Sequence, residues 1–265
     1  INDVNAASAT LSGTIATATL QNYGDSTVNS NALTTLNVTG TGGTLNVTTN
    51  SLTTAANTTL DLNVNGLSYV NAAVGNNGIT IDTDVTTLNL DSSTAASTIA
   101  TVSATGATAV NISGDALVTL TANAFNAASV ITVTNTAGAS LGTALATGVT
   151  FTGGDGVDTV SLGATTKAIA MGGGNDTVTT AGLVGTAGSV NAGTGTDTIV
   201  MSGANAATAS SSAVFNAAFT NFNALTVSAG GAANVNLAGI NGVSTVNTSG
   251  QTGILALSSF AQGGT

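Results

Sequence analysis

Residues 153–160 read Gly153-Gly-Asp-Gly-Val-Asp-Thr-Val160, which matches the pattern G-G-x-G-x-D-x-U, where U is a large aliphatic residue. Two weaker copies follow downstream, and their aspartates are Asp176 and Asp197. A glycine stands two and four residues before each of the three aspartates, and a threonine and an aliphatic residue follow it. The glycine pairs are Gly154 and Gly156, Gly172 and Gly174, and Gly193 and Gly195. The aspartates are separated by steps of 18 and 21 residues, which indicates a repeating structural unit.

Nonapeptide repeats of this form are typical of parallel β-helices that bind Ca²⁺. Two nonapeptides make one turn, so a step of 18 residues returns the chain to the same side, one strand spacing (~4.8 Å) along the axis. Asp158 and Asp176 are therefore expected to stack. The third copy has Ala192 and Thr194 around its glycines and three extra residues before it. Both a cation site and a plain turn are consistent with that copy.

Stacked carboxylates repel one another unless a proton or a cation lies between them. Ca²⁺ is a hard cation with flexible coordination, held by carboxylate and carbonyl oxygens at about 2.3–2.6 Å. Glycines allow the positive φ angles that turn carbonyl groups toward one point. We therefore expect Ca²⁺ as the cofactor. The predicted metal-binding residues are Gly154, Asp155, Gly156, Asp158, Gly172, Gly174 and Asp176, with Gly193, Gly195 and Asp197 from the third copy.

The opposite side of the same coil lacks the aspartate. Nine residues after Asp158 stands Lys167, the only basic side chain of the protein, while the aliphatic Ile169 is kept. We expect Ca²⁺ on one edge only. Lys167 either caps the other edge, contacts a nearby aspartate or is solvated.

Composition excludes most other functions. The chain of 265 residues has no His, Cys, Pro or Trp, and its eleven acidic residues are all Asp. Common zinc sites and nucleophile–His–acid arrangements cannot be built, and no P-loop or dinucleotide fingerprint occurs. We therefore predict that the protein is not an enzyme. A net charge of −10 argues against binding to nucleic acid or to anionic membrane surfaces.

The chain is nevertheless expected to fold, because apolar residues reach 42% and charged residues only 5%. No stretch approaches the roughly 18 consecutive apolar residues of a membrane-spanning helix, so we expect no membrane insertion. The chain begins with Ile1 and ends in Gly-Gly-Thr, so we expect it to be a piece of a longer polypeptide.

Short segments that alternate aliphatic residues with Thr, Asn or Ser recur throughout, as half-buried strands do. The clearest are 35–40, 44–48, 59–66, 87–91, 109–114, 130–134, 225–227 and 234–237. We predict an all-β, right-handed parallel β-solenoid of short strands. We divide it into Thr/Asn-rich rungs over 1–150, a calcium-binding β-roll over 151–200 and further solenoid over 201–265. A short helix or packed cap is expected near 206–224, where Phe215, Phe219 and Phe222 are interpreted as core or interface residues.

Three other aspartates, Asp82, Asp84 and Asp115, are either further Ca²⁺ ligands or solvated turn residues. Turn residues are the favoured interpretation, because the glycines of the repeat are missing around them.

The stretch from about 86 to 180 resembles the lattice-forming region of Caulobacter-type surface-layer (S-layer) proteins of the RTX class. The segments that carry the resemblance are Ser93-Thr-Ala-Ala-Ser-Thr-Ile-Ala100, Asn111-Ile-Ser-Gly-Asp115, Leu141-Gly-Thr-Ala-Leu-Ala-Thr-Gly-Val-Thr-Phe-Thr-Gly-Gly154 and Leu162-Gly-Ala-Thr-Thr-Lys-Ala-Ile-Ala-Met-Gly172. Weaker similarity extends to the segments 32–40 and 219–227.

This resemblance implies a secreted, Ca²⁺-dependent β-solenoid, exported by a type I system and assembled with copies of itself into a two-dimensional crystal on a Gram-negative cell. Regions outside this chain would bind cell-surface polysaccharide or lipopolysaccharide. The alternative is an RTX adhesin or carbohydrate-binding extracellular stalk, which tandem and closely similar domains would favour. An ice-binding solenoid and the β-roll of a secreted metalloprotease fit less well, because the Thr spacing is irregular and no zinc-binding helix is present.

Overall fold

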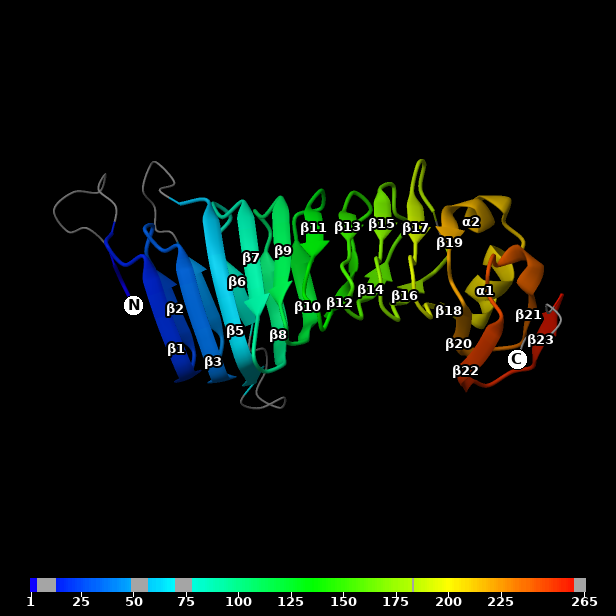
Figure 1. The fold of residues 1–265 in the computed structure, drawn as a ribbon, viewed down its shortest axis with the longest axis horizontal. Coiled ribbons are helices and arrows are strands. Elements are labelled where there is room, and N and C mark those ends of the chain that lie inside the picture. Colours follow the sequence, from blue (N-terminus) through cyan, green and yellow to red (C-terminus); the bar gives the residue numbers. More distant parts are fainter. Residues whose placement is uncertain (4–12, 49–56, 70–77, 183, 260–265) are drawn as a thin grey trace. The chain divides into compact units, whose positions relative to one another are not determined.

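The structure is a computed structural model that describes residues 1–3, 13–48, 57–69, 78–182 and 184–259. The chain divides into two compact units, Ile1–Thr143 and Ala144–Thr265. Within each unit, short parallel strands lie side by side in the order of the sequence (Figure 1). No helix in the described ranges is both long and apolar enough to cross a membrane.

Unit 1 is built from two parallel sheets, and successive strands alternate between them. The first sheet contains β1 (Thr17–Tyr23), β3 (Thr35–Gly42), β5 (Thr59–Tyr69), β7 (Thr87–Ser92), β9 (Ala109–Gly114) and β11 (Val130–Val133). The second contains β2 (Ser26–Asn29), β4 (Leu45–Thr48), β6 (Gly78–Ile81), β8 (Ser97–Ala104), β10 (Val118–Phe125) and β12 (Ala139–Leu145), which ends past the unit boundary. Each odd and even pair thus forms one turn of a solenoid.

The core of unit 1 consists of aliphatic side chains stacked from strand to strand. In β7, Leu88, Leu90 and Ser92 are buried, whereas the alternate residues face outward. Strand register places Leu90 beside inward-facing residues of the neighbouring strands. The resulting column runs through Leu36, Leu62, Leu90, Ile112 and Val133, none more than 1% exposed. Burial of such a column is the main favourable contribution to stacking.

Unit 2 repeats this construction. One sheet contains β13 (Thr150–Thr152), β15 (Ala168–Ala170), β17 (Ser189–Asn191) and β19 (Phe219–Thr220). The other contains β14 (Thr159–Leu162), β16 (Thr177–Thr180), β18 (Thr198–Ser202), β20 (Ala224–Gly230) and β22 (Thr245–Gln251). A separate pair is formed by β21 (Ala233–Asn236) and β23 (Leu255–Ser258), with the 3-10 turn η1 (Leu237–Gly239).

Two short helices, α1 (Gly203–Ala209) and α2 (Ala213–Ala218), are inserted between β18 and β19. Each begins at a serine, Ser202 or Ser212, whose hydroxyl accepts a backbone N–H of the first turn, and alanine favours both helices. Phe215 of α2 stacks on Phe219 with ring centroids 4.4 Å apart, and Phe222 lies 6.2 Å from Phe219. All three rings are buried, so the prediction that they are core residues is confirmed.

The predicted parallel β-solenoid of short strands is confirmed. Each of the eight alternating segments overlaps a strand, and only Thr44, Thr134 and Leu237 lie just outside β4, β11 and β21, with Leu237 in η1. The short helix or packed cap expected near 206–224 is present as two short helices and three buried aromatic rings. Two helices span 203–218, because Ser210 and Ser211 end the first and Ser212 caps the second, and residues 219–220 form β19. The three-part division by composition stays a prediction.

Candidate functional site

The aspartates of the three motif copies each stand directly before a strand of the same sheet. Asp158 precedes β14, Asp176 precedes β16 and Asp197 precedes β18. Thr159 pairs with Thr177, and Thr177 pairs with Thr198, so the three aspartates occupy one register position in successive turns. The expected stacking of Asp158 on Asp176 is therefore confirmed. We call these three residues the aspartate column.

The third aspartate is in register although its step is three residues longer. The chain between β16 and β17 has eight residues, 181–188, whereas the equivalent connection between β14 and β15 has five, 163–167. The extra residues are therefore absorbed on the opposite edge of the turn and leave Asp197 in the column.

Hydrogen bonds between backbone and carboxylate link the column. The N–H of Asp158 donates to Asp176 Oδ1 at 2.7 Å, and the N–H of Asp176 donates to Asp197 Oδ1 at 2.9 Å. The N–H of Asp197 donates in the same way to Asn223 Oδ1, at 2.8 Å. Each side chain thus reaches back to the preceding turn.

The motif glycines are required by the close stacking of the turns. Gly172, Gly174, Gly193 and Gly195 all have positive φ angles, between 92° and 139°. A β-carbon at any of them would overlap or press on the carbonyl oxygen of the glycine one turn before it, and those oxygens belong to Gly154, Gly156, Gly172 and Gly174. The glycine carbonyls therefore face the next turn at a distance that excludes any side chain.

Burial makes the column electrostatically unfavourable in the absence of a counter-charge. Asp158, Asp176 and Asp197 are at most 1% exposed. Burial raises the pKa of Asp176 from 3.8 to about 7; the hydrogen bond from the Asp158 N–H opposes this, and the charges of Asp158 and Asp197 add to it. Burial likewise raises the pKa of Asp197, against the hydrogen bond from Asp176. The Oδ2 atoms of Asp176 and Asp197 are buried and accept no hydrogen bond from the described residues.

These features fit a hard cation in part. Carboxylate oxygens without donors and backbone carbonyl oxygens are the ligand types that Ca²⁺ prefers. The carbonyls of Gly154 and Gly172 each accept one backbone N–H, from Gly173 at 2.7 Å and Thr194 at 2.8 Å, so a second lone pair is left on each. However, no group of three or more Asp, Glu, His or Cys in the described part of the chain is placed to hold a metal ion. A site here would combine at most two neighbouring carboxylates with backbone oxygens.

Asp155 lies apart from the aspartate column. Its side chain is exposed, and a β-carbon on Gly173 of the next turn would lie 3.1 Å from Asp155 Oδ1. It therefore sits at the surface of the same turn as the column.

Lys167 lies in the turn between β14 and β15, on the edge opposite the aspartates, and its side chain is exposed. Its backbone N–H donates to Thr165 Oγ1 at 3.2 Å, and its carbonyl accepts the N–H of Ser189 at 3.2 Å. Within the described ranges its ammonium group forms no ion pair, so the arrangement corresponds to the solvated lysine.

The other candidate aspartates have the hydrogen bonds of turn residues. Asp82 Oδ1 accepts the N–H of Asp84 at 3.2 Å, and Asp115 Oδ1 accepts the N–H of Thr94 in the preceding turn at 2.8 Å. The first contact fixes local backbone conformation, as expected of a turn residue. The second ties the turn of Asp115 to the turn before it.

Sequence reasoning missed Asn223, the fourth member of the series. Ala224 pairs with Thr198 and Leu225 with Ile199, so Asn223 occupies the position of Asp197 one turn later. The detectable signal was the order polar residue, small residue, aliphatic residue in Asn223-Ala-Leu225, which repeats Asp197-Thr-Ile199. The helical insertion lengthens the step to 26 residues and hid it.

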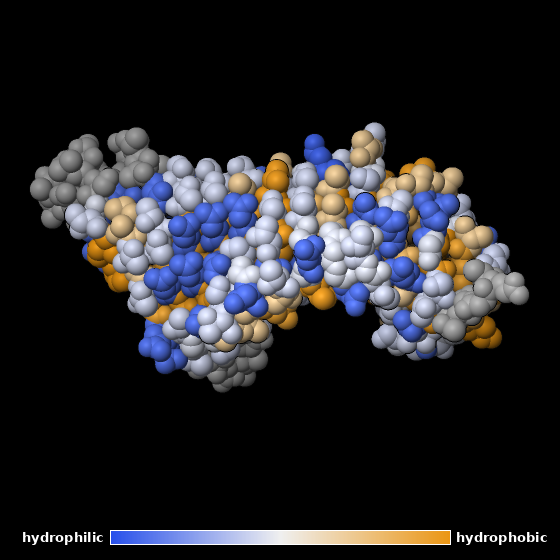
Figure 2. Space-filling view, viewed as in Figure 1, coloured by the Kyte–Doolittle hydropathy of each residue, from blue (hydrophilic) through white to orange (hydrophobic). Residues whose placement is uncertain are grey.

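A second polar column lies on the outer face of unit 1. Asn63 Nδ2 donates to Asn37 Oδ1 at 2.8 Å, and Asn37 Nδ2 donates to Thr19 Oγ1 at 3.2 Å. In a parallel series, Asn111 donates to Asn89 at 2.8 Å and Asn89 donates to Asp61 at 2.7 Å. We call both series the amide columns. Figure 2 shows the hydrophilic patch over β3, β5 and β7 where they lie.

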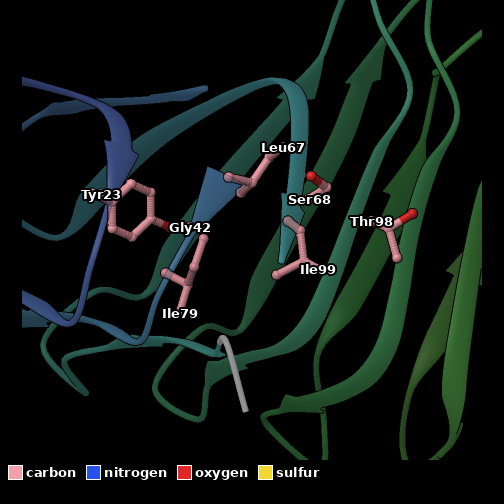
Figure 3. Close-up of a pocket in the computed structure, with 7 residues that line it drawn as sticks. All are labelled: Tyr23, Gly42, Leu67, Ser68, Ile79, Thr98 and Ile99. Atoms are coloured by element: carbon pink, nitrogen blue, oxygen red, sulfur yellow. The ribbon is translucent and has the colours of Figure 1, made fainter. Parts of the chain in front are cut away.

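Three pockets formed by the described residues bring no acid–base groups together. The small pocket in Figure 3, between Tyr23, Leu67, Ile79 and Ile99, has a volume of about 10 Å³, enough for about one water. Burial raises the pKa of the Tyr23 phenol to about 12, so it is a neutral core residue at physiological pH. Two open grooves occur in unit 2. One lies between residues 184–189 and α2, the other along 161–162, 179–181 and 200–205, and neither is lined by a charged side chain.

No protein-family model matches the chain, and no curated protein is significantly similar to it. The resemblance to S-layer proteins consequently rests on the sequence segments quoted above.

Proposed function

We propose that the chain is a structural module of a secreted, calcium-dependent bacterial S-layer that assembles with copies of itself into a two-dimensional lattice. The observation that carries the calcium dependence is the aspartate column. Three buried carboxylates stack at strand spacing, two of them have an oxygen without a hydrogen-bond donor, and the only lysine is on the other edge. A divalent cation is the simplest counter-charge for this arrangement.

The carboxylates of Asp158, Asp176 and Asp197 would hold Ca²⁺ together with carbonyl oxygens of the glycine turns. The ion would supply positive charge and additional bonds between successive turns. The protein's own contribution is to hold the carboxylates at fixed spacing by their backbone hydrogen bonds and to let the turns stack closely through glycine. Binding to the folded chain alone stabilises it by mass action.

Self-association is the activity that suits the remaining surface. The outward positions of the strands are mainly Thr, Asn and Ser, and the grooves offer no acid–base pair for catalysis. Contacts between such polar faces are individually weak, but a lattice repeats them and multiplies their effect. Ca²⁺ would also reduce the repulsion between subunits of net charge −10. The resemblance adds type I export and the surface of a Gram-negative cell, with anchoring to polysaccharide by regions outside this chain.

Electron microscopy of the full-length protein tests this proposal. We expect ordered sheets with millimolar Ca²⁺ and soluble monomers with chelator. A variant with Asp158, Asp176 and Asp197 all changed to Asn should form no sheets in Ca²⁺. Strictly monomeric scattering at high protein concentration with Ca²⁺ would overturn the lattice proposal.

The alternative of an extracellular stalk that binds carbohydrate is favoured by one observation. The open groove along β14, β16 and β18 is lined by hydroxyl and amide side chains, which match the hydrogen-bonding groups of sugars. These side chains are Ser161, Thr179, Thr180, Ser202, Asn205 and Ser228. Binding of purified surface glycans by a monomer, lost in an Asn205→Ala variant, would support the stalk over the lattice.

A further inference from the structure

Asn223 keeps the position of the aspartate column but not its charge. Its Oδ1 accepts the N–H of Asp197 at 2.8 Å, within 0.1 Å of the two carboxylate contacts before it. Its own carbonyl accepts the N–H groups of Ser244 and Thr245, at 2.9 and 3.2 Å, so the stack continues into β22. In this turn a neutral side chain therefore makes the hydrogen bond that a carboxylate makes in the two turns before it.

The turn that contains Asn223 has also lost the glycines. Asp197 stands six residues after Asn191, whereas Asn223 stands only three residues after Thr220, which pairs with Asn191. The shortened turn is Asn221-Phe222, and Asn221 itself adopts a positive φ of 66°. Asn221 Nδ2 donates to Asn191 Oδ1 at 2.7 Å, which ties the turn to its neighbour by an amide contact. No glycine carbonyl in this turn is presented toward Asn223.

A carboxylate at this position would satisfy the same N–H but would have no counter-charge. It would lie one strand spacing, ~4.8 Å, from the Asp197 position. Like charges at that separation, partly buried, repel appreciably. An amide oxygen accepts the hydrogen bond without charge.

We infer that Asn223 ends the run of charged side chains in the aspartate column. It thereby limits the cation-dependent part of unit 2 to the turns of Asp158, Asp176 and Asp197. The turns after it, in β20 and β22, are then held by aliphatic packing and neutral hydrogen bonds alone. The charge-terminating role is independent of which cation binds, whereas the confinement of cation dependence rests on the proposed function.

The first test compares two added charges in the metal-free protein. Asn223→Asp places a carboxylate in the column, and Asn247→Asp places one at an exposed position of the neighbouring strand β22. In chelator near pH 8, we expect Asn223→Asp to lower Tm by about 4 °C or more, and Asn247→Asp to shift it by about 2 °C or less. Equal shifts would overturn the inference, whatever the effect of Ca²⁺.

A neutral substitution keeps the test decisive if Asn223→Asp does not fold. Asn223→Ser retains a hydroxyl acceptor without charge and should fold. If Asn223→Ser is also unfolded, the amide's shape and not the absence of charge is what matters, and the inference fails.

Hydrogen exchange of the wild-type chain tests the confinement. On addition of chelator, we expect the amides of β14, β16 and β18 to lose at least tenfold in protection while those of β22 change less than threefold. Equal loss in β22 would contradict confinement. If chelator changes the protection of none of these amides, the proposed cation dependence is refuted. The comparison of Asn223→Asp with Asn247→Asp then decides whether Asn223 ends the run of charged side chains.

Discussion

The amide columns on the outer face of unit 1 and the aspartate column in unit 2 both stack polar side chains at strand spacing, but with different chemistry. Each Asn carries a donor and an acceptor, so Asn63, Asn37 and Asn89 can each bond to a neighbour on the next strand. A carboxylate only accepts, so the aspartates take their donors from the backbone N–H of the preceding turn.

The two columns also differ in solvent access. The residues of the amide columns are half-buried or exposed, whereas those of the aspartate column are at most 1% exposed. A column of exposed or half-buried amides can therefore extend from strand to strand without a counter-charge. A buried acidic column accumulates repulsion with every turn and has to be neutralised or ended, and Asn223 ends it.

Removal of metal should produce the largest difference between the two columns. With Ca²⁺ at about 100 times Kd, each bound ion adds about 2.7 kcal/mol, or roughly 5–10 °C in Tm for a chain of this size. We expect EDTA to lower Tm by at least this amount and to reduce the β signal in circular dichroism, with recovery in millimolar Ca²⁺. Unchanged melting in EDTA would show that the aspartate column, like the amide columns, needs no cation.

Neutralising one aspartate should have opposite effects with and without Ca²⁺. Asp176→Asn keeps the acceptor for the Asp158 N–H but removes a buried charge, so in chelator at pH 8 we expect a higher Tm than wild type. In Ca²⁺ titrations by calorimetry we expect about tenfold weaker binding or more, equal to about 1.4 kcal/mol or more. Asp115→Asn, at an exposed turn, is the matched control and should alter neither. A lower Tm for Asp176→Asn in chelator would contradict the electrostatic account.

The stability of the metal-free protein should fall as pH rises from about 4 to about 7. The folded state retains a proton on Asp176 up to about pH 7, whereas the unfolded chain releases it near 3.8. The stabilisation is therefore complete below the unfolded pKa and is lost as pH passes the folded pKa. Tm measured in EDTA between pH 4 and 8 checks this, and Asp176→Asn should flatten the profile. A Tm that rises with pH in EDTA would be the opposite of what burial predicts.

A carboxylate introduced into an amide column should have the smallest effect. Asn89→Asp removes the donor to Asp61 and places two carboxylates side by side on the outer face, where solvent screens them. We expect a loss of about 1 kcal/mol or less, with no dependence on Ca²⁺. Urea denaturation with and without EDTA measures both. A loss as large as that of Asn223→Asp would mean that burial is not what distinguishes the columns.

The sequence was sufficient for the features set by strict local spacing. The alternating segments predicted strands because aliphatic residues occupy every second position, and the 18-residue step predicted the stacking of Asp158 on Asp176. The sequence predicted a solvated Lys167 side chain only as one of several alternatives. Spacing alone did not decide whether Asp197 stacks on Asp176, because a 21-residue step does not show which connection contains the three extra residues.

Other features depend on register that only the fold provides. Asn37, Asn63, Asn89 and Asn111 lie on different strands. The steps between bonded partners of the amide columns range from 18 to 28 residues and follow no fixed period. Asn223 is separated from Asp197 by two helices that the solenoid inserts outside its stack. Irregular connections conceal such positions because the chain returns to register only through packing of the buried aliphatic residues.

A crystal structure of the chain grown with Ca²⁺, with anomalous diffraction data collected, tests the central claim most directly. We predict anomalous density between the carboxylates of Asp158 and Asp176 and between those of Asp176 and Asp197, and none beside Asn223 or the amide columns. No anomalous density along the aspartate column at saturating Ca²⁺ would contradict the claim.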